Sequence, residues 1–474
     1  MKRPTKATSI RYNLKFLPII YYLLLVSQKH IASSSIFSKT YQRLPFVSFV
    51  TQNDNENKEK SAAKSKRITT NPFKLKSFTD SVETETDNDS IKMSTNQGIA
   101  SRLARPNILE LQPYRCARDD YHDGVLLDAN ENAFGPTSLP TKSLDPYDNS
   151  NTLERYPDPY QRELKELFCR ERGNDLQPSN VFVGVGSDEA IDLLMRIFCT
   201  PGASTGNSGD NILITPPTYG MYKVCAKVND VQIVSAPLTP DFDMDIPKMM
   251  ETVTEKTKLL FICSPGNPTC KAIPLAEIEK IASDTEKYPG LIVVDEAYID
   301  FAGENASAVA LLKKYDNIVV LQTLSKAFGL AGIRCGFCIG PPDVIQLMNN
   351  VKAPYNVNSL TSEVAINAMN SMDTLRKNVQ STLVERARVR KELEALTDIV
   401  VKVYPSDSNF LLFRVKNDLK AVDVYKKMAD DGVVTRFRGN EIHCDQCIRA
   451  TIGTPEENSK FLEKLQVTWK AMLA

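Results

Sequence analysis

The chain has 474 residues, of which 42% are hydrophobic, so it is long enough to bury a large core and to form two domains with appended segments. Its 58 basic and 58 acidic side chains give a formal net charge of zero, which argues against a global field that attracts nucleic acid. The ten cysteines lack the framework of a small secreted scaffold, so free thiols in a reducing compartment are the simpler interpretation.

The first 50 residues have the composition of a targeting leader. Five basic and no acidic side chains in residues 1–15 precede an apolar run, 16–26, that is too short to span a bilayer comfortably. This start is typical of a signal peptide, and the basic, acid-free residues 38–43 resemble a transit peptide. We expect this bipartite leader to direct the chain to a plastid bounded by extra membranes, and the mature form to have no membrane contact. A mitochondrial leader, a plain secretory signal and an uncleaved anchor are the alternatives.

A polar tract, residues 51–95, follows the leader. It contains too few apolar side chains to offset the entropy lost on ordering, so we expect a disordered linker there. The folded body is predicted to begin near Asn96.

Short apolar runs then alternate with helical or loop stretches. Residues 187–199 carry apolar side chains at helical spacing. Fully apolar strands that alternate with helices favour an α/β fold, in which a mostly parallel seven-stranded sheet lies between helices and ligands bind at the carboxyl ends of the strands. The predicted strands are 181–184, 212–214, 232–236, 259–263, 291–294, 319–321 and 333–339.

The pattern changes after about residue 360. A long charged helical stretch reaches about Leu396, and residues 399–403, 410–415 and 448–452 have the composition of strands. We therefore predict a large domain at 161–358 and a smaller α/β domain at 359–474. Residues 96–160 are predicted to form an N-terminal arm and part of the small domain.

Two CxxC pairs, Cys335–Cys338 and Cys444–Cys447, could supply four zinc ligands or a redox dithiol. The first pair lies in a predicted buried strand and the pairs are more than a hundred residues apart, so we predict no metal site. Of the three histidines one, His30, lies in the leader, which disfavours a hydrolase built on a nucleophile–histidine pair.

Two segments that follow predicted strands have side chains suited to a flat, phosphorylated ligand. Residues 184–189 join a strand to a helix with two glycines, and the N-terminus of the helix offers unpaired N–H groups to a phosphate. Tyr219 follows another strand, where its ring could stack on a flat ligand. The alternatives are a plain helix cap by Ser187 and a tyrosine of the core.

Asn267, Asp295 and Lys326 follow three further strand-like segments in turn. A carboxylate at the end of an apolar strand is costly unless it is paired, and a protonated ring nitrogen would pair with Asp295. Burial would lower the pKa of Lys326 and free its lone pair to attack a carbonyl. The alternatives are an ordinary turn at Asn267, a metal ligand or structural ion pair at Asp295, and a lysine that ends a strand.

One cofactor needs all these groups together. Pyridoxal phosphate requires a lysine that bonds to its aldehyde, an acid beside its ring nitrogen and a phosphate site. Ser325 and Arg334, close to Lys326 in sequence, would suit the phosphate. The residues therefore predict pyridoxal 5'-phosphate as the cofactor.

These motifs resemble those of the fold-type I pyridoxal-phosphate aminotransferases, and most closely the class II-type histidinol-phosphate aminotransferase family. The resemblance runs from about Asn107 to the C-terminus. Cys270 stands where the family usually has glycine, which puts the turn beside Asn267 in question. The motifs that carry the resemblance are residues 127–132, 155–157, 186–189, 216–222, 264–269, 294–298, 323–336 and 448–454.

The resemblance implies a role for each cofactor-binding residue. Lys326 bonds covalently to the cofactor and later moves a proton. Asp295 holds the ring nitrogen, Asn267 and Tyr298 bind the ring hydroxyl, and Tyr219 stacks on the ring. The residues expected around the phosphate are Ser187, Asp188, Ser325 and Arg334.

The resemblance also implies a substrate pocket. Tyr114 and Asn130 would line it, and Arg436 and Arg449 would bind the anionic groups of the substrates. Tyr156 would come from a partner subunit, so a homodimer with shared active sites is expected.

The activity expected from the resemblance is amino transfer between histidinol phosphate and 2-oxoglutarate, a step of histidine biosynthesis. An aromatic aminotransferase or a phospho-amino-acid decarboxylase would share the cofactor-binding residues, so these activities are the alternatives. A ligand-sensing module of a transcription regulator is an alternative of another class, which would require a DNA-binding domain.

Overall fold

The computed structural model describes residues 98–109, 153–206 and 208–474. The predicted leader and linker lie outside these residues. Within the described part of the chain, no helix is both long and apolar enough to cross a membrane.

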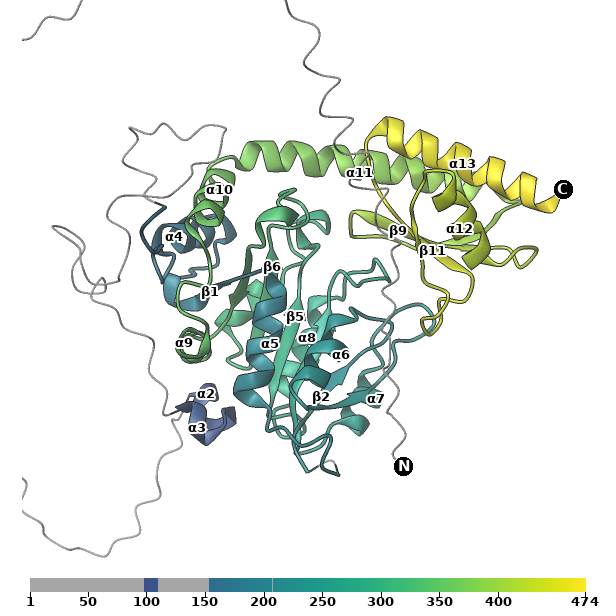
Figure 1. The fold of residues 1–474 in the computed structure, drawn as a ribbon. Helices are drawn as coiled ribbons and strands as arrows, with labels where there is room; N and C mark the ends of the chain where they lie inside the picture. Colours follow the sequence, from purple (N-terminus) through teal and green to yellow (C-terminus); the bar gives the residue numbers. More distant parts are fainter. Residues whose placement is uncertain (1–97, 110–152, 207) are drawn as a thin grey trace, which may run out of the picture. The chain divides into compact units, whose positions relative to one another are not determined.

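A seven-stranded sheet forms the centre of the large domain, with the strand order β1-β7-β6-β5-β4-β2-β3 (Figure 1). The pairs from β3 through β2, β4 and β5 to β6 are parallel, and β7 runs antiparallel to both β1 and β6. The prediction of a mostly parallel sheet is confirmed. The strands are β1 (Val181–Gly184), β2 (Asn211–Ile214), β3 (Gln232–Ser235), β4 (Thr257–Cys263), β5 (Leu291–Asp295), β6 (Ile318–Thr323) and β7 (Gly336–Ile339).

The last strand is shorter than predicted, because β7 begins at Gly336 and not at Ile333. Residues Ala331–Ile333 form a 3-10 turn, and Arg334 has a φ of 53°, in the left-handed region that a strand cannot contain. This turn directs the Arg334 side chain away from the sheet and towards the N-terminus of helix α5 (Ser187–Phe198).

Successive residues of each strand point to opposite faces of the sheet, and both faces are covered. On β5, for example, Ile292 and Val294 belong to one apolar core, while Leu291 and Val293 belong to the other. All four side chains are fully buried, and burial of such a side chain is worth about 1.5–3 kcal/mol relative to exposure. The alternation explains why the strands are apolar on both faces and not on one only.

The helices divide between the two faces. Helices α5 and α6 lie in front of the sheet in Figure 1, and together with α9 they contribute to the core that contains Leu291. The helices of this face are α2 (Ile99–Leu103), α3 (Pro106–Leu109), α5, α6 (Met221–Val228) and α9 (Pro342–Val351). The helices of the other face are α4 (Arg162–Arg172), α7 (Ile246–Thr252) and α8 (Leu275–Ser283). The 3-10 helices of the large domain are η2 (Pro178–Asn180), η3 (Ile299–Phe301), η4 (Ala308–Lys313) and η5 (Ala331–Ile333).

The C-terminal part of the chain forms a second, antiparallel sheet of four strands in the order β10-β11-β9-β8. The three predicted strands of this region are confirmed, and β10 was not predicted. The predicted continuous helix is two helices, interrupted at Asn370 and Ser371. The elements are α10 (Ser359–Met369), α11 (Met372–Ala395), β8 (Val400–Val403), β9 (Phe410–Val415), α12 (Ala421–Asp430), β10 (Arg436–Phe437), β11 (Cys447–Thr451) and α13 (Pro455–Leu473).

The helices α11, α12 and α13 cover one face of the small sheet (Figure 1). Helix α13 begins with a capping box, in which Thr454 accepts from the backbone N–H of Glu457 and the Glu457 carboxylate accepts from the N–H of Thr454. The domain boundaries predicted at residues 160 and 358 stay predictions.

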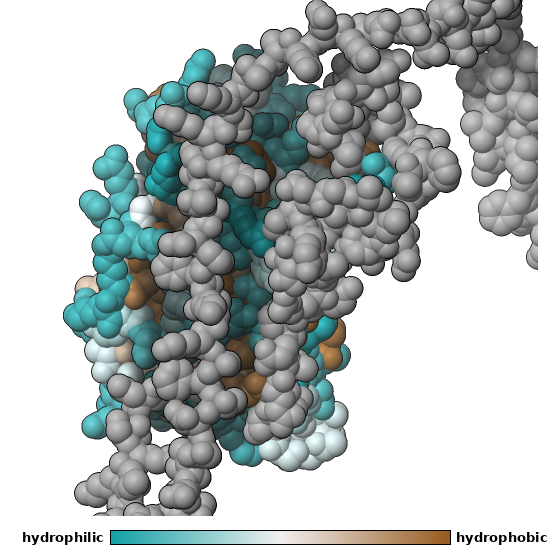
Figure 2. Space-filling view, turned by 90° about the vertical axis from the view of Figure 1, so that its left-hand side faces the viewer, coloured by the Kyte–Doolittle hydropathy of each residue, from teal (hydrophilic) through white to brown (hydrophobic). Residues whose placement is uncertain are grey.

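The visible described surface in Figure 2, seen from the left-hand side of Figure 1, is largely hydrophilic, with small apolar areas between the polar side chains. The exposed apolar side chains of the chain include Leu360 and Val364 on α10. Scattered exposure of this kind is usual for a folded protein, so it does not by itself identify a binding surface.

Candidate active site

A cavity of about 570 Å³ lies where the carboxyl ends of β4, β5 and β6 meet the small sheet. Because these three strands are neighbours and parallel, the residues that follow them come together at one edge of the sheet. The sequence-predicted residues that line the cavity are Ser187, Asp188, Tyr219, Asn267, Asp295, Tyr298, Ser325, Lys326, Arg334, Arg436 and Arg449.

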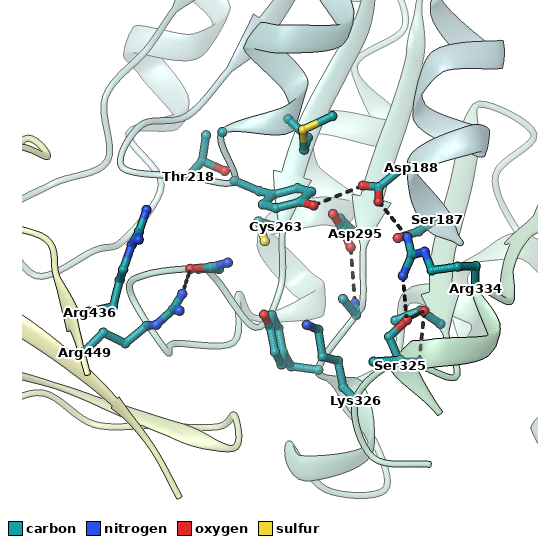
Figure 3. Close-up of a pocket in the computed structure, with 18 of the residues that line it drawn as sticks. Ser187, Asp188, Thr218, Cys263, Asp295, Ser325, Lys326, Arg334, Arg436 and Arg449 are labelled. Atoms are coloured by element: carbon teal, nitrogen blue, oxygen red, sulfur yellow. Dashed lines mark hydrogen bonds and ion pairs between the residues drawn. The ribbon is translucent and has the colours of Figure 1, made fainter. Parts of the chain in front are cut away.

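Lys326 follows β6, and its amine points into the cavity (Figure 3). The nitrogen lies 5.5 Å from the centre of the Tyr298 ring. The side chain is exposed to the space that it faces, yet the predicted lowering of its pKa by burial is confirmed. Partial desolvation still lowers the pKa of Lys326, and the nearby charges of Arg449 and Arg334 lower it further. A larger share of the amine is therefore neutral at neutral pH than for a lysine in water.

Asp295 is the last residue of β5 and is fully enclosed beside Cys263 of β4. Its carboxylate accepts a hydrogen bond of 2.6 Å from the Tyr222 hydroxyl and one of 3.2 Å from the N–H of Ala297. Burial raises the pKa of Asp295 to about 6 in spite of these two bonds. The environment therefore favours a cationic partner for this carboxylate, as the sequence predicted.

Asn267 lies in the loop after β4, and its side-chain oxygen faces the small sheet. It accepts a hydrogen bond of 2.6 Å from Arg449 and a longer one, 3.4 Å, from Arg438. Two guanidinium donors on the oxygen leave the amide NH2 as the group that can donate to a ligand oxygen. Behind Arg449 the Phe410 ring lies 5.0 Å from the guanidinium and packs edge-on against Tyr298.

The opposite side of the cavity holds the predicted phosphate-binding residues (Figure 3). Arg334 donates to the Asp188 carboxylate at 3.0 Å and to the Ser325 hydroxyl at 3.4 Å. The other oxygen of Asp188 accepts from the Tyr219 hydroxyl at 3.0 Å. Asp188 thus fixes the positions of Arg334 and Tyr219, and it raises the pKa of the Tyr219 phenol, although desolvation raises it more.

Helix α5 directs its N-terminus into this side of the cavity. Gly186, with φ of 76°, is the N-cap and has no side chain to cap the helix, so the alternative of a plain cap by Ser187 is wrong. A Cβ on Gly186 would lie 2.6 Å from an Arg334 nitrogen, and one on Gly336 would lie 2.3 Å from the backbone nitrogen of Ser187. Both glycines therefore allow Arg334 to lie directly against the helix N-terminus.

The donors gathered here fit a phosphorylated pyridine. The helix N-terminus, the two serine hydroxyls and the guanidinium of Arg334 are suited to a phosphate, and the buried acid to a protonated ring nitrogen. The hydroxyl of Thr218, which also lines the cavity, is buried without a hydrogen-bond partner in the described part of the chain. A buried hydroxyl of this kind is costly unless a ligand completes it.

Of the predicted substrate residues, only Tyr156, Arg436 and Arg449 can be placed relative to the cavity. Tyr114 and Asn130 lie outside the described residues. Tyr156 stacks on Tyr355, with ring centres 4.4 Å apart, and does not line the cavity of its own chain. Arg436 and Arg449 both line it, from β10 and β11.

Tyr222 and Arg438 are the chief residues that sequence reasoning missed. Tyr222 is the fully buried core tyrosine, whereas Tyr219 lines the cavity; the two rings meet edge to face. Arg438 stands two residues after Arg436, a spacing that would have placed both on one face of a strand. This strand could not be recognised in the sequence, because β10 is only two residues long.

In the described part of the chain, the two CxxC pairs are not gathered into one group of four cysteines. Cys335 and Cys338 belong to the cores on opposite faces of the large sheet, so their sulfurs cannot share an ion. Within the described residues no group of three or more His, Cys, Asp or Glu side chains is placed to hold a metal. Cys444 and Cys447 are both buried in the loop and strand that follow β10.

Cys270 keeps the backbone conformation that glycine would adopt. Its φ is 67°, and its N–H donates to the carbonyl of Gly266 at 2.8 Å. The turn beside Asn267 is therefore closed despite the side chain, which is buried.

Comparison with known proteins agrees with this geometry. The model of the family described as aminotransferase class I and II matches residues 122–465. A histidinol-phosphate aminotransferase of Schizosaccharomyces pombe is 44% identical over 383 residues, which cover 77% of this chain and 96% of that protein.

Two solved structures share the fold. The crystal structure of the histidinol-phosphate aminotransferase from Clostridium acetobutylicum, 25% identical, has a TM-score of 0.60 and covers 67% of this chain and 92% of its own. The Sinorhizobium meliloti enzyme of the same name, crystallised in complex with pyridoxal-5'-phosphate, is 20% identical with a TM-score of 0.59, covering 73% of this chain and 90% of its own. The fold, the strand-end residues and the relatives agree: the chain belongs to the class I and II aminotransferases and, within them, to the histidinol-phosphate aminotransferase family.

Proposed function

We propose that the chain is a pyridoxal-phosphate enzyme that transfers the amino group of L-histidinol phosphate to 2-oxoglutarate, giving imidazole-acetol phosphate and glutamate in histidine biosynthesis. The observation that carries the proposal is the meeting of Lys326, Asp295 and Asn267 with guanidinium groups in one cavity. The relatives' printed names support the choice of substrate.

Pyridoxal phosphate bound in this cavity supplies an electron sink and carries the amino group between the two substrates. The chain provides the groups that position it: Ser187, Ser325 and Arg334 for a phosphate, and Asp295 for a protonated ring nitrogen. Asp295 can keep this nitrogen protonated at neutral pH, because a buried carboxylate favours a cation beside it.

Lys326 is the group that bonds to the cofactor and that moves a proton at the α-carbon of the substrate. Its lowered pKa leaves more of the amine neutral, which both tasks require. Arg436 and Arg449 bind the anionic groups of the substrates, and Arg449 fixes the Asn267 oxygen at the same time.

The proposal includes a homodimer with shared active sites and a plastid address. The position of Tyr156 outside the cavity of its own chain supports a contribution from a second subunit. The address rests on the composition of residues 1–50 alone. Sedimentation of the purified protein and imaging of residues 1–92 fused to a fluorescent protein test these two parts.

The activity is tested with the purified holoenzyme and three substrates. Transfer from histidinol phosphate to 2-oxoglutarate, at a kcat/KM well above that for phenylalanine, is expected. A preference for phenylalanine would indicate an aromatic aminotransferase, and release of carbon dioxide from a phospho-amino acid would indicate a decarboxylase. The Lys326→Ala variant is the control for transfer that does not depend on the site.

A further inference from the structure

The substrate side of the cavity carries three guanidinium groups on one face of the β10–β11 ribbon. Arg436 and Arg449 are direct partners across this antiparallel pair. The pairing continues beyond β10, because the N–H of Arg438 donates to the carbonyl of Cys447 at 2.9 Å. Arg438 therefore follows Arg436 on the same face, and all three side chains line the cavity.

The three arginines have little negative charge of their own to balance them. The cavity is lined by five cationic side chains and two carboxylates, and one of those carboxylates, Asp188, already pairs with Arg334 on the opposite side. In the described part of the chain no carboxylate oxygen lies within 4 Å of a guanidinium nitrogen of Arg436 or Arg449. The site is thus built to receive anionic charge from a ligand.

Arg438 shows this need most clearly. Its side chain is only 21% exposed, and its ion pair with Glu441 is long, 3.8 Å. Its hydrogen bond to Asn267 is also long, at 3.4 Å, and its Nε atom is buried without a partner among the described residues. The Nε atom of Arg449 is also buried without a hydrogen-bond partner among the described residues. Buried donors of a charged group cost free energy until an acceptor satisfies them.

We infer that Arg438 is a specificity-determining residue, which with Arg436 and Arg449 binds the phosphate of a phosphomonoester substrate. A phosphomonoester carries about −1.5 to −2 charges at pH 7 on three acceptor oxygens, so it can use three guanidinium groups at once. A carboxylate has one charge and two oxygens, which a single arginine satisfies with its two parallel N–H groups. Arg438 therefore favours phosphate over carboxylate, and this inference rests on the proposed function.

The test compares Arg438→Gln and Arg438→Lys with the wild-type holoenzyme. Arg390→Gln is the matched control, because the Arg390 side chain on α11 is 41% exposed and pairs with Glu394 at 2.8 Å. Binding of phenyl phosphate and of benzoate is measured by calorimetric titration at pH 5.5 and 7.0. KM and kcat are then measured for histidinol phosphate and for 2-oxoglutarate.

The glutamine variant should bind phenyl phosphate and histidinol phosphate at least about tenfold more weakly, since a hydrogen bond to a charged group is lost. Its affinity for benzoate and its KM for 2-oxoglutarate should change less than about threefold. The lysine variant should recover part of the loss, because it keeps the charge but not the fork of donors. Wild-type affinity for phenyl phosphate should rise between pH 5.5 and 7.0 as the dianion forms, and this rise should shrink in the glutamine variant.

Unchanged phenyl phosphate binding in both variants, no binding by the wild type, or an equal loss for phosphate and carboxylate ligands would each overturn the inference. If the glutamine variant does not fold, the lysine variant decides by the same comparison. Failure of the proposed function has a different signature: the wild type would not transfer the amino group of histidinol phosphate, whether or not Arg438 governs phenyl phosphate binding.

Discussion

Replacing Asp295 by asparagine should change how the stability of the cofactor-free enzyme depends on pH. The pKa of Asp295 rises from an ordinary value of 3.8 to about 6 in the folded chain, chiefly through burial. Between these two pH values the folded state holds a proton that the unfolded state has released. Stability therefore falls as the pH rises from about 4 to about 6, and the whole penalty is present above that range.

The magnitude follows from the two pKa values. At 1.36 kcal/mol per pKa unit, the full penalty for ionised Asp295 is about 3 kcal/mol at pH 7.5. Integration of the proton linkage assigns about 1.4 kcal/mol of it to the interval between pH 5 and 7.5. For a folded body of this size, 1.4 kcal/mol corresponds to about 2 °C in melting temperature. The amide that replaces the carboxyl group in the variant cannot ionise, so this part of the pH dependence should disappear.

The assay is thermal unfolding of both cofactor-free proteins at pH 5 and 7.5. Glu296, whose pKa is raised to about 7 by burial, contributes to the pH dependence of both proteins, so only their difference reports on Asp295. The new amide NH2 group changes the stability of the variant equally at both pH values, so it does not affect the difference between the melting temperatures at pH 5 and 7.5. Asp398→Asn, at an exposed carboxyl, should behave as the wild type. Equal pH dependence in the wild type and the Asp295→Asn variant would refute this account of the buried acid.

Three further substitutions test the site. Lys326→Ala should abolish amino transfer, measured as glutamate formed, and normal turnover by this variant would refute the assignment of the lysine. Tyr222→Phe removes the 2.6 Å hydrogen bond to Asp295, so the pKa of this acid should rise further. The kcat/KM for amino transfer should then fall about tenfold, and an unchanged kcat/KM would contradict the role of the bond. Gly186→Ala places a Cβ atom 2.6 Å from an Arg334 nitrogen at a residue with positive φ, so it should weaken cofactor binding about tenfold. Titration of the cofactor-free enzyme with the cofactor measures this affinity. An unchanged affinity would show that the helix N-terminus does not bind the phosphate.

The fold was predictable where a single segment carries its own signal. The apolar run that ends at Asp295 and the helical spacing after Ser187 need no information from distant residues, and both elements are found at the predicted places. The strand predicted from Ile333 failed because Arg334 adopts a left-handed conformation, and its side chain pairs with Asp188, which is 146 residues away in the sequence. A pattern within one segment cannot contain that information.

The site divides in the same way. Lys326 and Asp295 were recognisable because each lies at the carboxyl end of a strand or just after it, and neighbouring parallel strands bring such residues together. Arg438 and Tyr222 were missed because their importance depends on what faces them. Tyr222 differs from an ordinary core tyrosine only through its bond to Asp295, and Arg438 only through the register of β10 against β11.

The charges at the two sides of the cavity act on Lys326 together. Arg449 and Arg334 both lower its pKa, and Arg449 has the larger effect of the two. An anion that binds to the arginines of the small sheet offsets the charge of Arg449, so it should raise the pKa of Lys326. The amine is therefore most readily neutral, and most nucleophilic, while the substrate side is empty. It should become a stronger base once an anionic substrate occupies that side, which is when the proposed function requires a proton to leave the α-carbon. We therefore expect substrate binding at the arginines and proton transfer at Lys326 to be coupled through this electrostatic interaction.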